Sequence, residues 1–195
     1  DLHSFPTRRS SDLTNEDENR ANVYWGLEVL KKQHRAGLKA LLALAGTSKE
    51  EITARTLGFG LGPRMNAAGR LESANYSLEM LRAKDRTAAF VSAQKLDDFN
   101  TQRKSIQQKI FNEACQQADE MGADRVLVVA SEGWNHGVIG IVASKLVETY
   151  KKPVFIIGIR GEVATGSARS FGDFSAADAV RAADDIILRG GGHVG

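Results

Sequence analysis

The chain has 195 residues, 42% hydrophobic, 26% charged and 7% aromatic, as expected for an ordinary globular protein of one large or two small domains. No apolar run approaches the roughly 18 residues that a membrane span requires, which argues against a membrane protein. The net charge of +2 says little about partners, and the single cysteine, Cys115, forms no internal disulfide, which fits a reducing cytoplasm.

Helical spacing of apolar residues dominates the first half of the chain. Residues 1–13 resemble a translated sequencing adapter and are left out of the fold prediction. Helices are predicted over 19–33, 38–45, 75–82 and 85–121. Thr47–Glu50 has the pattern of a capping box that opens a further turn. Asp85 is expected to cap the long helix, which no Gly or Pro interrupts.

Strands and helices alternate after Gly122. Strands are predicted over 125–130, 154–159 and 162–167, and helices over 138–150 and 175–188, the last capped by Ser175. A strand, helix and strand in succession are typical of a βαβ crossover. The predicted fold class is therefore α/β.

Positive charge is concentrated in the middle of the chain. Residues 55–110 contain ten Lys or Arg against five Asp or Glu, a local charge of +5. This distribution is compatible with a surface that follows a phosphate backbone. The alternative is a solvated helix face, which is the commoner origin of a run of charges.

The segment Gly62–Arg70 has the composition of a rigid, irregular turn. It holds two arginines, an asparagine, two glycines and a proline, without a large aliphatic residue. Guanidinium groups match phosphate geometry and stay charged, so Arg64 and Arg70 are candidate phosphate ligands, with Asn66 between them. The alternative is an ordinary Gly/Pro loop with two solvated arginines.

A second candidate segment joins a predicted strand to a helix at Ser131–Gly137. Ligands collect at the carboxyl ends of strands in open α/β sheets, and a helix N-terminus offers N–H groups to anions. Trp134 can stack on a base, while Asn135 and His136 can hydrogen-bond to phosphate. The alternative is that Trp134 packs in the core and His136 caps the helix.

Two further segments carry weaker signals. Arg169 stands between Ser167 and Ser170, where it can clamp a phosphate or lie in solvent on an edge strand. Gly191, Gly192 and His193 form a Gly-rich loop that can wrap a phosphate or be a simple turn.

Four motifs resemble, in order, those of the RecJ-like exonucleases of the DHH phosphoesterase superfamily. They are Gly62–Arg70 (GPRMNAAGR), residues 134–146 (WNHGVIGIVASKL), residues 166–170 (GSARS) and residues 191–193 (GGH). The family often has histidine where Asn135 stands, and His136 falls at a variable position. The resemblance therefore favours Asn135 over His136 as the residue with a role in binding.

The resemblance implies a domain organisation. Residues 14–84 would be the C-terminal part of the DHH metal domain, 85–121 a connecting helix, and 122–195 the DHH-associated nucleic-acid-binding domain. Residues 1–13 would be an adapter-derived tail. The Ala-Ala-Gly that the family places after its GGH motif is absent, which indicates an internal piece of a longer protein.

The resemblance also implies strand-binding residues, none of them catalytic and none a metal ligand. They are Arg64, Asn66, Arg70, Trp134, Asn135, His136, Gly137, Ser167, Arg169, Ser170, Gly191, Gly192 and His193. The chain lacks the Asp-His-His motif of the superfamily, and its four histidines are scattered. This piece alone is therefore expected to bind no metal ion and to have no nuclease activity.

The implied activity of the intact protein is 5′→3′ hydrolysis of single-stranded DNA with Mn²⁺ or Mg²⁺, in recombination and repair in a bacterial cytoplasm. The implied partners are single-stranded DNA, single-strand-binding protein and a RecQ-type helicase, with the enzyme acting as a monomer. Two alternatives remain: a related enzyme that degrades short RNA or cyclic dinucleotides, and a non-catalytic nucleic-acid-binding module.

Overall fold

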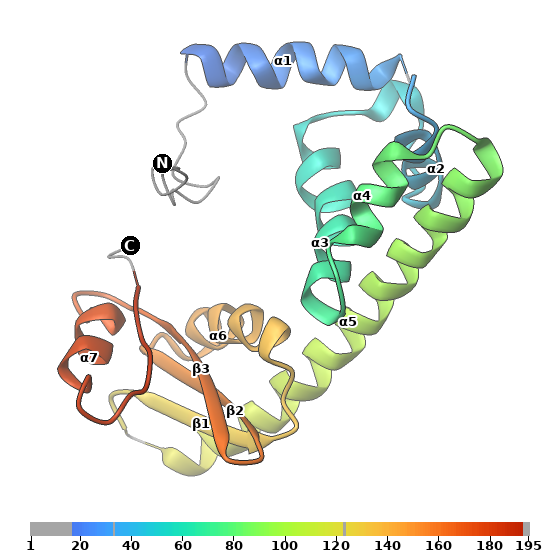
Figure 1. The fold of residues 1–195 in the computed structure, drawn as a ribbon. Helices are drawn as coiled ribbons and strands as arrows, with labels where there is room; N and C mark the ends of the chain where they lie inside the picture. Colours follow the sequence, from blue (N-terminus) through green and yellow to red (C-terminus); the bar gives the residue numbers. More distant parts are fainter. Residues whose placement is uncertain (1–16, 33, 123, 193–195) are drawn as a thin grey trace. The chain divides into compact units, whose positions relative to one another are not determined.

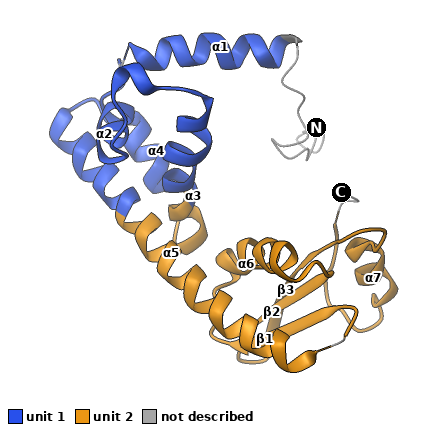
Figure 2. Cartoon of the chain, turned by 180° about the vertical axis from the view of Figure 1, so that it is seen from behind, with its two compact units in different colours: residues 1–66, 75–97 blue, residues 67–74, 98–195 orange. Residues whose placement is uncertain are grey.

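The structure is a computed structural model that describes residues 17–32, 34–122 and 124–192 (Figure 1). The chain divides into two compact units (Figure 2). The first contains Asp1–Asn66 and Asn75–Asp97, and the second contains Ala67–Ala74 and Asp98–Gly195. None of the helices in the described part of the chain combines the length and apolar character needed to span a membrane.

The first unit is built from helices. Its elements are α1 (Asp17–Lys31), α2 (Ala36–Leu44), a 3-10 turn η1 (Lys49–Glu51), a π-helical turn η2 (Thr56–Leu61), the start of α3 (Gly62–Leu71), α4 (Asn75–Arg82) and the start of α5 (Arg86–Met121). The predicted helices are confirmed to within two residues at each end. Leu41, Leu42, Met80 and Leu96 are fully buried and form the centre of this unit.

Two local predictions in the first half of the chain are wrong. Gly62–Arg70 is helical rather than irregular: the π-helical turn η2 continues directly into α3, and Ala67 and Ala68 are completely buried. The capping box lies one residue later than predicted. The Ser48 hydroxyl donates to Glu51 Oε2 at 2.8 Å, and the Ser48 N–H donates to the same atom at 3.1 Å.

The second unit contains the sheet. Its elements are the remainder of α3 and α5, then β1 (Leu127–Glu132), α6 (His136–Tyr150), β2 (Val154–Arg160), β3 (Val163–Arg169) and α7 (Ala176–Ala182). β2 pairs in parallel with β1 and antiparallel with β3, with Val154 opposite both Leu127 and Arg169. Since α6 connects the two parallel strands, the predicted βαβ crossover and the α/β class are confirmed.

One face of this sheet shares a core with α5 and α6. Alternate strand residues are buried there, namely Leu127 and Val129 of β1 and Val154 and Ile156 of β2. Ile110 and Ala114 of α5 belong to the same core. The second part of α5 is therefore an integral part of the domain with the sheet.

A side chain of α5 also covers the edge of β1. The Gln117 amide donates to the Ala130 carbonyl and accepts from the Ala130 N–H, both at 3.0 Å. These two bonds replace the backbone partners that an edge strand lacks, which protects the edge from pairing with another strand.

The last helix is shorter than predicted. α7 ends at Ala182, and turns follow instead of a helix to residue 188. Asp184 and Asp185 would occupy the C-terminal end of the longer helix, where the helix dipole disfavours carboxylates. The chain then packs against α7 at Gly190. A Cβ at this position would lie only 2.8 Å from Val180 Cγ1.

Candidate nucleic-acid interface

The first two motifs meet within the second unit. Arg70, in the last turn of α3, donates from Nη1 to the Gly137 carbonyl at 2.9 Å. A Cβ at Gly137 would lie 2.1 Å from the Arg70 carbonyl oxygen, so only glycine permits this approach of the two backbones. The arrangement places an exposed arginine beside the N-terminus of α6.

Asn135 is the N-cap of α6. Its backbone is extended, and its Oδ1 accepts from the Gly137 N–H at 2.9 Å. The Asn135 carbonyl accepts from the N–H groups of Val138 and Ile139. Asn135, rather than His136, is therefore the cap, and its side-chain oxygen is already engaged by the helix.

His136 packs against the sheet. A Cβ at Gly158 of β2 would lie 2.9 Å from His136 Cδ2, so the glycine makes room for the imidazole. His136 Nε2 is buried without a hydrogen-bond partner. The Nε2 atom is therefore not placed for the phosphate contact predicted for this side chain, while the residue as a whole is partly exposed.

The stacking role predicted for Trp134 is wrong in this structure. The residue is only 4% exposed and belongs to the core of the second unit. Its Nε1 donates to Glu113 Oε2 at 2.7 Å, which satisfies the indole N–H inside the protein. Gly133, with φ +73°, turns the chain so that Trp134 points back into the core.

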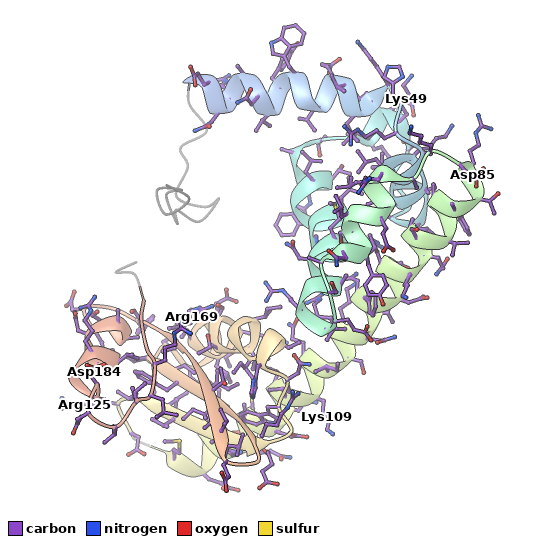
Figure 3. The ribbon with its side chains drawn as sticks, viewed as in Figure 1. Lys49, Asp85, Lys109, Arg125, Arg169 and Asp184 are labelled. Carbon is purple, nitrogen blue, oxygen red and sulfur yellow. The ribbon has the colours of Figure 1, made fainter. Side chains whose placement is uncertain are left out.

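Arg169 lies at the end of β3 (Figure 3) and is tied to α6. Nε donates to Ser144 Oγ at 3.1 Å, and Nη2 donates to the Gly140 carbonyl at 3.1 Å. Nη1 donates to Ser167 Oγ at 3.2 Å and to the Ala168 carbonyl at 2.7 Å. All three guanidinium nitrogens are thus engaged, so Arg169 is neither a solvated arginine nor an open clamp.

Ser170 and the Gly-rich loop lie near α7. Ser170 Oγ accepts from the Ala176 N–H at 3.0 Å and so holds the start of this helix. Gly191 and Gly192 are exposed, and a Cβ at Gly192 would lie 3.3 Å from Ala177 Cβ. His193 lies outside the described residues.

Arg64 is engaged within the first unit. Nε donates to Asp97 Oδ1 at 2.7 Å, Nη1 donates to the Gly60 carbonyl at 2.8 Å, and the side chain is 16% exposed. Asn66 is exposed. The motif thus contributes one ion-paired arginine to the first unit and one exposed arginine, Arg70, to the second.

Arg103 was missed by the sequence analysis as a candidate. It lies on α5 and donates to Asn100 Oδ1 at 3.0 Å and to Gln107 Oε1 at 2.7 Å. Burial, and secondarily the charge of nearby Arg70, lower the pKa of Arg103. The sequence did hold a signal for this cluster. Residues three and four apart share a helix face, and this spacing separates Asn100, Arg103 and Gln107.

The described residues contain no group of three or more His, Cys, Asp or Glu arranged to hold a metal ion. The exposed guanidinium of Arg70 offers hydrogen-bond donors of the kind that bind anions.

The class of the second unit follows from comparison with known proteins. Residues 123–195 match the DHHA1 domain, which confirms the DHH-associated domain expected from the motifs. The chain is 40% identical over 180 residues to "Single-stranded-DNA-specific exonuclease RecJ" of Bacillus subtilis, covering 91% of this chain and 23% of the relative. Against RecJ of Escherichia coli, identity is 32% over 195 residues, covering 94% of this chain and 34% of the relative.

Solved structures agree with this similarity. RecJ of Thermus thermophilus in complex with Mg²⁺ matches 93% of this chain and 28% of that chain, with a TM-score of 0.82 and 31% identity. An exonuclease RecJ bound to manganese matches 90% of this chain and 43% of that chain, with a TM-score of 0.77 and 32% identity. The chain is thus similar to RecJ over about nine-tenths of its own length, and its residues 123–195 match the DHHA1 domain. It spans about a quarter to a third of the length of these curated relatives.

Proposed function

We propose that this chain is part of a RecJ-like exonuclease that hydrolyses single-stranded DNA in the 5′→3′ direction. The observation that carries the proposal is the hydrogen bond from Arg70 to the Gly137 carbonyl, which joins two RecJ-like motifs. The chain that holds these motifs is similar to RecJ over nine-tenths of its length. In this proposal the chain supplies nucleic-acid binding, and residues 14–84 and 122–195 derive from the metal domain and the DHHA1 domain.

A divalent metal ion, Mn²⁺ or Mg²⁺, is proposed for the intact protein, because the RecJ structures contain these ions. Such an ion supplies an activated water for hydrolysis of a phosphodiester. The described residues here offer no ligand cluster that fits the ion. We therefore assign no step of the hydrolysis to them.

The proposed binding residues divide into two groups by their exposure. Arg70, Asn66, Gly191 and Gly192 are exposed and are proposed to contact the strand. The other proposed residues hold the backbone in place through internal contacts: Arg64, Trp134, Asn135, His136, Gly137, Ser167, Arg169 and Ser170. His193 follows the exposed glycines and is proposed with them.

The proposed cellular role is DNA recombination and repair in a bacterial cytoplasm. Single-strand-binding protein and a RecQ-type helicase are proposed as partners, and the enzyme is proposed to act as a monomer. A related oligoribonuclease or cyclic-dinucleotide phosphodiesterase is the less favoured function, because the relatives described above are named as single-stranded-DNA-specific exonucleases.

Fluorescence polarisation with a labelled single-stranded oligonucleotide tests the proposal. We expect the full chain to bind it more tightly than a duplex of the same sequence, with an affinity that falls steeply as salt rises, because phosphate contacts release counterions. A short RNA and a cyclic dinucleotide serve as competitors. Absence of DNA binding at low salt by a folded chain, or stronger competition by RNA, would contradict the proposal.

A further inference from the structure

Arg103 is a partly buried cation with no anionic partner among the residues that the structure describes. Its two Nη donors are held by the amide oxygens of Asn100 and Gln107, and Asn100 is only 2% exposed. Its Nε is buried with no hydrogen-bond partner. Among the residues that the structure describes, no carboxylate lies within ion-pair distance of Arg103. The amides fix the orientation of the guanidinium but leave its charge uncompensated.

Arg70 is the second cation, and its side chain is exposed rather than partly buried. Its guanidinium is exposed, and Nη1 donates to the Gly137 carbonyl. It too has no carboxylate within ion-pair distance in the described part of the chain. The glycine contact with the Arg70 backbone fixes the base of this side chain.

The two arginines lie on two elements of the second unit that pack beside each other, α3 and α5. Leu71 follows Arg70, Ile106 lies one helical turn after Arg103, and both pack against the same core. The last turns of α3 lie beside α5 (Figure 2). The positive charge of Arg70 contributes to the lowered pKa of Arg103, as expected for close like charges.

Two positive charges close together repel each other, and an anion bound between them relieves this repulsion. The N-terminus of α6 next to Arg70 adds positive potential at the same place. Guanidinium groups hydrogen-bond to phosphate oxygens through paired N–H donors.

We infer that Arg70 and Arg103 together bind one internucleotide phosphate of the DNA strand, with Arg103 as a strand-contacting residue outside the four RecJ-like motifs. This inference rests on the proposed function for the identity of the ligand. The pairing of the arginines as a phosphate site is argued from their separate hydrogen bonds and their positions on α3 and α5.

The test compares Arg103→Gln with the wild-type full chain in oligonucleotide binding over a salt series. Loss of one phosphate contact should lower the slope of log affinity against log salt by about 0.7 for a single strand. The affinity should fall about tenfold, as expected for a charged hydrogen bond. Arg103→Lys should keep the slope but lose part of the affinity, because it retains the charge without the planar fork.

Two further variants sharpen the result. Lys104→Gln, at an exposed neighbouring position of α5, removes the same charge and should keep the wild-type slope. The double variant of Arg70→Gln and Arg103→Gln should lose less affinity than the two single losses combined, because both arginines serve one phosphate. Equal effects of Arg103→Gln and Lys104→Gln, or fully additive losses, would overturn the inference.

Inorganic phosphate separates this inference from the proposed function. At constant ionic strength, phosphate in place of chloride should raise the unfolding temperature of the wild type more than that of Arg103→Gln, whether or not DNA binds. If DNA fails to bind while this difference persists, the proposed function fails and the phosphate site stands. If DNA binds but Arg103→Gln equals the wild type in both assays, only the site is disproved.

Discussion

The arginines show that residue type alone does not define a role. Arg64 is paired with Asp97, and Arg169 uses all three guanidinium nitrogens on oxygens within its own unit. Arg70 keeps most of its donors exposed. A guanidinium whose donors are already satisfied gains less from a phosphate than one whose donors face water. The binding capacity of the motifs is therefore unequal along the chain.

Trp134→Phe tests the role of the buried indole. The free energy of unfolding should fall by about 1–2 kcal/mol, because Glu113 loses a hydrogen-bond donor to its carboxylate. Affinity for a single-stranded oligonucleotide, measured per folded molecule, should stay unchanged. Urea unfolding and polarisation provide the two readouts.

Trp25→Phe is a control for Trp134→Phe, because Trp25 is 66% exposed on α1. It should leave the stability nearly unchanged. If Trp134→Phe weakened DNA binding without lowering stability, the indole would contact the strand after all.

At the scale of elements, local pattern predicted α4 and the start of α5 well. Asp85 caps α5 as predicted, since its Oδ2 accepts from the Ala88 N–H at 2.8 Å. These elements follow from short-range rules of capping and periodicity. The same rules did not predict the helix over Gly62–Arg70. This helix is stabilised by the burial of Ala67 and Ala68, which depends on tertiary packing.

The capping box around η1 predicts a pH-dependent stability. Hydrogen bonds from the Ser48 hydroxyl and then the Ser48 N–H lower the pKa of Glu51 from its ordinary value of 4.5. A carboxylate with a lower pKa in the folded state stabilises the protein above the unfolded-state pKa, and this stabilisation is lost as pH falls through the folded-state pKa. Glu51→Gln should therefore lower the unfolding temperature at about pH 6 but not at about pH 2.5.

The control for this prediction is Glu50→Gln, which changes the same charge without the hydrogen bonds to Ser48. Its effect on the unfolding temperature should be smaller at about pH 6. A pH-independent difference between Glu51→Gln and the wild type would contradict the role of the ionised carboxylate.

At the scale of the whole molecule, the chain has two cores. Leu41 is completely buried in the first unit and Leu146 in the second. Truncation of a buried leucine to alanine typically costs about 2–5 kcal/mol. Hydrogen exchange followed by mass spectrometry should show faster exchange mainly in the first unit for Leu41→Ala and mainly in the second for Leu146→Ala. Uniformly faster exchange in both units from either variant would show that the cores unfold together.

The sequence by itself determined the class of the fold, most helix and strand positions, and the similarity to RecJ. These depend on periodicity, caps and motifs, which are properties of neighbouring residues. It also marked Arg64, Arg70 and Arg169 as candidates without ranking them.

Only the tertiary structure decided which of these side chains remain available. Asp97 and Gly140 engage Arg64 and Arg169 from positions about 30 residues away, and Glu113 holds Trp134 in the core. Arg103 became a candidate only when its described surroundings showed two amides, the charge of Arg70 and no carboxylate within ion-pair distance. The physical reason is that exposure and hydrogen-bond satisfaction are set by partners far along the chain, which no local pattern contains.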